Sequence, residues 1–467
     1  MPTRHTLILT LLVLLLGTAP LKAAEAPNQA PTPPSAWSAH EAVRFALANN
    51  PDSKGGRHRL VAAQAAIDLE RAALSPQVSL SAQYSQLNAP MYSFGNILNQ
   101  GEFTPAINFN DPGRTDSLSG TVQLGYRLYN GGRDKAGVKA ATAQADATRM
   151  DLSAIHARLA FEVVKSFHGI TQAEGIAQAQ QAAVEAGAAS LAVAKARHDA
   201  GVLLLDSVLD LEVQQSRALE NQIQAQHTLA LSRKVFLTLL GVETGSTELI
   251  PETGHDAQAV PSATHYDGRF ELKNLDAMIE AAQARVSQAK AGASPTVDGF
   301  AGYTLDQGSI TGGTGDYWQA GVKLQYPLFD GHRTDSEVAR ATAQLAEMRE
   351  QRHKLSLAIG LEVEQASLAL QETEGRLKVS EKTVSQAQES AAINRARFTE
   401  GVVLSSDLIA AENRLTEAMI RRTVAQTARR VAIADLRRAM GLPQFDDINE
   451  IQTASQSHHP LNSSGLR

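Results

Sequence analysis

The chain of 467 residues contains no cysteine. Disulfide bonds, thiolate metal ligands and a lipidated cysteine behind an export signal are therefore excluded. Aromatic residues make up only 5% of the sequence, which is little for one large globular core. We therefore expect an elongated chain whose stability comes from packing along extended elements and from assembly.

A surplus of positive charge and the motifs of catalysis are also missing. The formal net charge is -6, whereas a nucleic-acid partner usually requires a clustered basic face. The histidines form no His-Glu-x-x-His or other paired ligand motif, and no nucleophile elbow is present. No nucleic-acid partner, metal site, cofactor or enzyme activity is predicted.

Long apolar runs are absent after the first segment. Leu7–Leu16 is almost unbroken in its hydrophobicity, and small residues follow at Ala23 and Ala24. This pattern predicts a signal peptide over residues 1–24 and export from the cytoplasm. No later stretch reaches the roughly 18 to 20 apolar residues of a membrane-spanning helix, so membrane contact is expected to be peripheral or made by strands.

The sequence does contain an internal repeat. Val122 matches Val322 and Gly241 matches Gly441, an offset of 200 that holds between them without a gap. Upstream, Ser75 matches Ser294, so 19 extra residues lie between the strands of the first copy. The predicted order in each copy is helix, strand, loop, strand, long helix, turn and helix. The predicted boundaries are a signal peptide at 1–24, a first repeat at 25–250, a linker at 251–266, a second repeat at 267–442 and a disordered tail at 443–467.

Four segments alternate between apolar and polar residues with the period of a strand. They are Val78–Tyr84, Leu118–Leu128, Val297–Leu305 and Trp318–Leu328. Four strands cannot close a barrel, so two interpretations stay open: a barrel completed by other copies, or a small soluble sheet lying on the helices. The export signal and the helix lengths favour the barrel, because unpaired strand edges cannot face lipid.

Two polar segments are predicted to be hairpin loops. They are Asn110–Gly113 and the glycine-rich Gly308–Gly315. The second superficially resembles a phosphate-binding loop, but it lacks the lysine and precedes a strand instead of a helix. We therefore interpret it as a turn.

Apolar residues recur at spacings of three and four over Arg133–His198 and again over Arg333–Phe398. Each segment predicts one amphipathic helix of about 99 Å. Shorter helices at 38–73 and 203–240 would together match that length. The expected fold is mainly α with a β-barrel contribution, in which long coiled-coil helices form a tunnel. A non-conducting periplasmic coiled-coil scaffold is the alternative, but it leaves the strands unexplained.

The six-residue segments Leu128–Arg133 and Leu328–Arg333 each end a strand and open a long helix. They resemble the hallmark of the TolC-type outer-membrane efflux protein family. The opening segment 42–51 and the Ala-Arg-x-x-x-Gly turns at 196–201 and 396–401 extend the resemblance over essentially the whole mature chain.

The resemblance implies a homotrimer with a twelve-stranded barrel in the outer-membrane lipid and a helical tunnel through the periplasm. It also implies a periplasmic adaptor protein and an inner-membrane pump as partners. The implied function is passive export of small toxic compounds in an efflux or type I secretion system. Whether the cargo is a small compound or a polypeptide stays open.

The resemblance further implies that the two helix-helix turns dock the adaptor. The residues concerned are Ala200, Gly201, Val202, Glu400, Gly401 and Val402. A second interpretation is that the two glycines only turn the chain, where a positive φ is needed.

Asp407 is similar to the first of two aspartates that line the tunnel constriction in the family, and the second position is Ala410. Three copies near an axis would attract cations. The alternative is an aspartate that stabilises a helix N-terminus through the helix dipole. Asp206 and Asp210 are weaker candidates for the same constriction, which would act as the periplasmic gate of the tunnel.

Overall fold

The computed structural model describes residues 33–250, 260–261 and 266–445. The predicted signal peptide, residues 251–259 and 262–265 of the predicted linker, and residues 446–467 of the predicted tail lie outside the described residues. The first three tail residues pack against the last helix, where buried Gln444 donates a hydrogen bond to the carbonyl oxygen of Ala434 at 2.9 Å.

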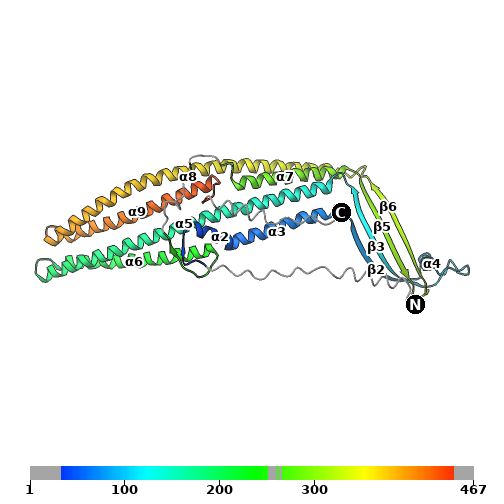
Figure 1. Ribbon diagram of the computed structural model, residues 1–467, viewed down its shortest axis with the longest axis horizontal. Helices are drawn as coiled ribbons and strands as arrows, with labels where there is room; N and C mark the ends of the chain where they lie inside the picture. The colour runs from blue at the N-terminus through cyan, green and yellow to red at the C-terminus, as the bar shows by residue number, and fades with distance from the viewer. Residues whose placement is uncertain (1–32, 251–259, 262–265, 446–467) are drawn as a thin grey trace.

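Long helices dominate the described chain, and four strands form one sheet at one end (Figure 1). The helices are α2 (Ala39–Asn49), α3 (Pro51–Ala72), α4 (Pro90–Asn99), α5 (Arg133–Asp199), α6 (Leu205–Leu240), α7 (Phe270–Lys290), α8 (Arg333–Glu400) and α9 (Ser405–Ala439), with a 3-10 turn at Ala291–Ala293. The strands of the sheet are β2 (Gln77–Leu87), β3 (Thr115–Tyr129), β5 (Thr296–Gln307) and β6 (Thr314–Gln325). None of the described helices combines the length and the hydrophobicity that a membrane span requires.

The four strands lie in the antiparallel order β2-β3-β5-β6. Each strand runs directly into or out of a helix: α3 leads to β2, β3 to α5, α7 to β5 and β6 to α8. The helices beside the sheet therefore keep the same order, α3, α5, α7 and α8. In the other half of the molecule α6 and α9 replace α3 and α7, giving α6, α5, α9 and α8. The chain is thus a wall that is four elements wide along its length.

The two halves of the wall meet at a hydrophobic core on α2, α5 and α6. Trp37, Phe236 and Ile170 are fully buried there. Two short parallel strands, β1 (Ala36–Trp37) and β4 (Glu248–Leu249), cover this core. The indole Nε1 of Trp37 donates to the carbonyl oxygen of Ser246 at 2.9 Å. The N-terminal segment and the end of the first repeat are thereby joined.

The hallmark segments turn the chain from strand to long helix through two successive residues with positive φ. These are Gly131 and Gly132 in the first repeat and Gly331 and His332 in the second. A Cβ on Gly131 would lie 2.2 Å from the Cβ of Ser294, so that position also requires glycine for space. His332 occupies a conformation that side chains with a Cβ rarely adopt.

The structure adds the short strands β1 and β4, which were not predicted, and departs from the predicted elements in four further places. The helix predicted over 38–73 is divided at Asn50, because Pro51 begins a new helix and disfavours a helical residue before it. Strand β6 ends at Gln325 instead of Leu328, since Pro327 has no N–H to donate. Gly315 lies within β6, and the 19-residue insertion contains the unpredicted helix α4.

Candidate functional site

The sheet has one apolar and one polar face, and its register aligns them across all four strands. Residues paired across antiparallel strands point to the same side. Leu80 pairs with Val122, Val122 with Tyr303, and Tyr303 with Trp318. The apolar face comprises Val78, Leu80, Ala82, Tyr84, Leu118, Val122, Leu124, Tyr126, Val297, Ala301, Tyr303, Leu305, Trp318, Ala320, Val322 and Leu324.

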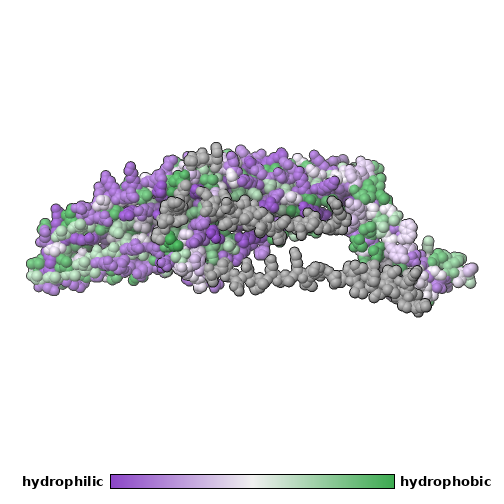
Figure 2. Space-filling model, viewed as in Figure 1, coloured by the Kyte–Doolittle hydropathy of each residue, from purple (hydrophilic) through white to green (hydrophobic). Residues whose placement is uncertain are grey.

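Side chains on the opposite face form polar contacts with one another. The Ser117 hydroxyl donates to Asp306 Oδ1 at 2.8 Å, and the hydroxyls of Thr121 and Thr304 lie 2.9 Å apart. Arg127 Nε donates to the carboxylate of Asp298 at 3.0 Å. Phe300 and Tyr317 are exceptions on this face. Figure 2 shows hydrophobic side chains gathered over the sheet, in contrast to the hydrophilic surface of most of the helices. Such a sheet can separate an apolar environment from an aqueous one.

The two helix-helix turns lie together at the end of the molecule opposite the sheet (Figure 1). They share one backbone design. Gly201 and Gly401 have φ of 75° and 85°, and the N–H of the following valine bonds back to the carbonyl oxygen of Arg197 or Arg397, at 3.0 and 2.9 Å. These bonds satisfy carbonyl groups at the helix ends, as in the Schellman motif.

Contacts between the two helical hairpins hold the turns together. The Arg197 guanidinium donates to the carbonyl oxygen of Phe398 and lies 5.4 Å from the centre of its ring. A Cβ on Gly401 would lie 2.5 Å from Arg197 Nη2, so glycine serves this contact as well as the turn. Below the turns, Leu191, Ala194, Val208, Leu211, Phe398 and Leu408 form a buried cluster contributed by α5, α6, α8 and α9.

The predicted docking residues and their neighbours form an exposed, largely apolar surface. Ala200, Gly201, Val202, Glu400, Gly401 and Val402 are all exposed. Large aliphatic side chains with more than half of their surface exposed follow each turn: Val202, Leu204, Leu205, Val402 and Leu404. Exposed apolar residues gathered in this way are typical of a protein contact surface.

The three candidate gate residues lie at the same end, and all are exposed. Asp206 and Asp407 occupy the first turns of α6 and α9, while Asp210 lies one turn beyond Asp206. Among the described residues none of the three carboxylates forms an ion pair. The structure therefore brings them to the tip without joining them, and the first-turn positions also suit the helix-dipole interpretation.

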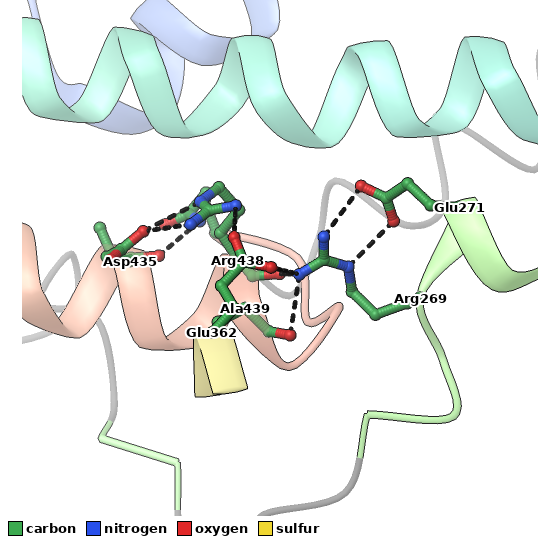
Figure 3. Close-up of polar contacts among 8 residues, drawn as sticks. Arg269, Glu271, Glu362, Asp435, Arg438 and Ala439 are labelled. Atoms are coloured by element: carbon green, nitrogen blue, oxygen red, sulfur yellow. Dashed lines mark hydrogen bonds and ion pairs between the residues drawn. The ribbon is translucent and has the colours of Figure 1, made fainter. Parts of the chain in front are cut away.

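A cluster of charged residues, which we did not predict from the sequence, fixes the start of α7 to α8 and α9 (Figure 3). Arg269, whose side chain is only 7% exposed, donates to Glu362 at 2.8 Å, to Glu271 at 2.9 Å and to the carbonyl oxygen of Ala439 at 3.0 Å. Arg438 donates to Glu362 at 2.6 Å and to Asp435. We call these five charged residues, Arg269, Glu271, Glu362, Asp435 and Arg438, the mid-chain clasp.

The electrostatics of the clasp favour its ionised form. Burial opposes ionisation of Glu362, but hydrogen bonds and charge from Arg438 and Arg269 lower the pKa of its carboxyl below the usual value. Burial likewise opposes the charge on Arg438, while Asp435 and Glu362 raise its pKa. The first repeat has a smaller counterpart, because Asn50 donates to the carbonyl oxygen of Leu239 at 2.9 Å. Both repeats thus fix the final turn of their last helix at mid-length.

The described residues contain no group of three or more histidines, aspartates and glutamates arranged to hold a metal ion. A groove between α8 and α9 has a volume of about 680 Å³ and is lined by residues that include Gly375, Arg376, Ala418 and Arg421. Its lining mixes charged, polar and apolar side chains.

Comparison with known proteins gives one consistent result. Residues 42–242 and 266–442 match the outer membrane efflux protein family. Protein CyaE of Bordetella pertussis is 27% identical over 336 residues, 70% of this chain and 67% of the relative. The fusaric acid resistance protein FusA of Burkholderia cepacia is 28% identical over 324 residues, 64% of this chain and 57% of the relative. The CmeC outer membrane channel of Campylobacter jejuni has the same fold, with a TM-score of 0.75, 15% identity, and coverage of 90% of this chain and 89% of that chain.

Proposed function

Because the chain belongs to the outer membrane efflux protein family, we propose that three copies form a passive duct for small toxic compounds. The sheet would lie in the outer membrane and the helices in the periplasm. A periplasmic adaptor and an inner-membrane pump would supply cargo and energy, and this subunit would catalyse no reaction. The division into repeats at 25–250 and 267–442 is part of the same proposal.

The observation that carries the proposal is the distribution of exposed apolar residues among the long helices. The outer helices of the wall, α3, α6 and α8, expose large aliphatic side chains, whereas the inner helices α5, α7 and α9 expose none. These side chains are Val61, Leu69, Leu205, Leu209, Val213, Leu219, Ile223, Leu231, Val235, Leu357, Leu361, Leu368, Val379 and Ile393. Both lateral edges of the wall therefore require a partner.

The edges of the sheet also require a partner. Among the described residues, strands β2 and β6 each pair on one side only, and an unpaired edge cannot face lipid. If β6 of one copy pairs with β2 of the next, the edge helices of the two copies also meet. Three copies of four strands give twelve, a number that closes as a barrel with its apolar face outward.

The tip supports the proposed adaptor contact. The exposed aliphatic residues at the two turns, Val202, Leu204, Leu205, Val402 and Leu404, give a partner an apolar surface. The backbone design of the turns and the Arg197 contact keep this surface in a defined shape. Asp407, with Asp206 and Asp210, would place negative charge around the opening at the same end.

The proposed cargo is a small toxic compound because the name of the relative FusA refers to resistance to fusaric acid. Export of a polypeptide by a type I system is the variant within the same channel class. A complementation assay separates the two kinds of cargo. Cells lacking their own duct should regain resistance to a toxic organic compound when this chain is supplied with its adaptor and pump. Restored export of a polypeptide without restored resistance would support the variant.

The duct itself is tested by inserting the purified mature protein into planar lipid bilayers. We expect heat-resistant trimers on electrophoresis, stepwise ion currents, and fractionation with the outer membrane. A protein that stays soluble without detergent, leaves the outer membrane on washing and passes no current would instead be the periplasmic scaffold.

A further inference from the structure

The two hairpins of the sheet end differently. Between β5 and β6 the chain turns within residues 308–313, whereas residues 88–114 between β2 and β3 form a longer extension that includes α4. The extension lies at the far end of the molecule, beyond the sheet (Figure 1). No part of the proposed function uses it.

One buried side chain joins the extension to the sheet. Gln100 follows α4 and is 1% exposed. Its Nε2 donates to the carbonyl oxygen of Asp116 at 2.8 Å and to Asp306 Oδ1 at 3.3 Å, while its Oε1 accepts from the Thr311 hydroxyl at 2.5 Å. The side chain thus contacts β3, β5 and the short turn together, and we call these contacts the Gln100 latch.

The latch explains the glycine-rich segment Gly308–Gly315, which resembled a phosphate-binding loop in the sequence. A Cβ on Gly315 would lie 1.8 Å from the carbonyl oxygen of Asn99, and a Cβ on Gly313 would lie 2.3 Å from that of Gln100. The backbone after α4 therefore packs directly against the short turn. Gly313 and Gly315, which we call the glycine seat, let the backbone of the extension pack closely against the turn, and they do not form a ligand loop.

The extension approaches the sheet from its polar side. Asp306 and Thr304 belong to the polar face, and both are buried at the end of the sheet that carries the latch. Gln123 lies further along the same face and is exposed. In a barrel with its apolar face in lipid, the polar face lines the interior, so the extension lies toward the opening.

Internal contacts keep the extension together as a unit. The rings of Phe94, Phe103 and Phe109 pack against one another, with centroid distances from 4.7 to 6.5 Å. Asn96 Nδ2 donates to the Thr115 hydroxyl at 3.1 Å, close to the start of β3. Such a unit can swing about its two connections to the strands without losing the contacts among its three rings.

We propose that residues 88–114 form an outer gate that narrows the extracellular mouth of the duct and is held closed by the Gln100 latch. This inference rests on the proposed function, since it requires the duct. Three copies of the extension would project over one opening from its rim. Loss of the latch would favour the open arrangement, because the amide of Gln100 would exchange its protein partners for water.

The test is single-channel conductance of the full mature protein in planar bilayers. In one variant, residues 88–114 are replaced by the sequence of the chain's own short turn, 308–313. We expect its conductance to rise by about twofold or more, because the constriction at the mouth is removed. Gln100→Ala and the isosteric Thr311→Val keep the extension but weaken the latch, and each should raise the ratio of open to partly closed events by about tenfold.

Asn99→Ala is the matched control. Asn99 is the neighbouring amide, its side chain is exposed, and only its backbone meets the glycine seat. If the turn replacement has wild-type conductance and Gln100→Ala has wild-type gating, the proposed outer gate is wrong, while the duct itself is unaffected. A wild-type protein that passes no current at all would instead refute the proposed function. If the turn replacement does not form trimers, Gln100→Ala and Thr311→Val decide alone, and wild-type gating in both would overturn the inference.

Discussion

At the residue scale, some equivalent positions in the two repeats carry different residue types. Asp407 in α9 corresponds to Ser207, and Asp210 in α6 corresponds to Ala410. These two aspartates are therefore not repeated, although the turns beside them are. A charge that occurs once per chain gives a ring of three in a trimer, and such a ring acts on ions through its summed field.

Replacing Asp407 by Asn tests that ring. We expect the permeability ratio of potassium to chloride to fall by about twofold or more, because three negative charges leave the opening. The measurement is the reversal potential in a salt gradient across a planar bilayer. Asp52→Asn removes an exposed carboxylate near the start of α3, far from the tip, and serves as the control. Equal ratios in wild type and Asp407→Asn would assign Asp407 to the helix terminus alone.

Two buried histidines on α5 make stability depend on pH. Burial lowers the pKa of His156 and His168 from 6.5 to about 4 in each case, with smaller contributions from the charges of Arg57 and Arg430. The unfolded chain therefore binds these two protons at a higher pH than the folded chain does. Stability should fall as the pH drops from about 6.5 to about 4, by up to about 3 kcal/mol per histidine.

The measurement is the thermal midpoint of the detergent-solubilised trimer at pH 7 and pH 5, followed by circular dichroism. The double variant His156→Gln, His168→Gln should show a smaller loss of midpoint between the two pH values than wild type. His58→Gln changes an exposed histidine on α3 and should behave like wild type. A double variant with the full wild-type loss would assign the acid sensitivity to other groups.

At the element scale, the edge helices of the wall expose large aliphatic side chains and the inner helices do not. The outer helix α8 exposes Leu361 and Leu368 one heptad apart, a spacing that suits packing against another helix. Burying such a side chain contributes about 1.5 to 3 kcal/mol, and each leucine is used three times in a trimer. The edge helices should therefore govern assembly, while the inner helices govern the fold of each chain.

The double variant Leu361→Gln, Leu368→Gln tests this division. We expect the trimer to dissociate at a lower temperature on electrophoresis, while the helix content of the chain stays unchanged by circular dichroism. Lys378→Gln, on the exposed surface of the same helix, should leave the trimer as heat-resistant as wild type. Unaltered trimers in the double variant would place the contact between copies elsewhere.

Much of the order of helices and strands could be predicted because the same pattern occurs in both repeats of the sequence. The long helices begin at Arg133 and Arg333 as predicted, and all four strands overlap their predicted segments. Helix α4 has no counterpart in the second repeat, and at ten residues it is too short for periodicity alone to identify it as a helix. The mid-chain clasp and the Gln100 latch could not be predicted, because each joins residues from three or more separate segments and leaves no local pattern. The structure places Asp407 and the two turns at one end of the molecule, and their roles stay predictions because they depend on the assembled molecule.

At the scale of the whole molecule, the strands and helices keep one lateral order from end to end. The first repeat supplies β2, β3, α3, α5 and α6, and the second supplies β5, β6, α7, α8 and α9. The repeats meet along the seams of β3 with β5, α5 with α7 and α5 with α9, and no element passes between the strands or helices of the other repeat. Each repeat is therefore a complete lateral section of the wall.

This arrangement predicts that covalent continuity between the repeats is dispensable. The seams hold the two sections by side-chain packing and strand pairing, which do not require that both belong to one polypeptide. A gene divided within codons 251–265, with a copy of the signal peptide added to the second half, should yield two separate chains that assemble in the periplasm. The ring would then contain six polypeptides in two alternating kinds, with the same wall around the same opening.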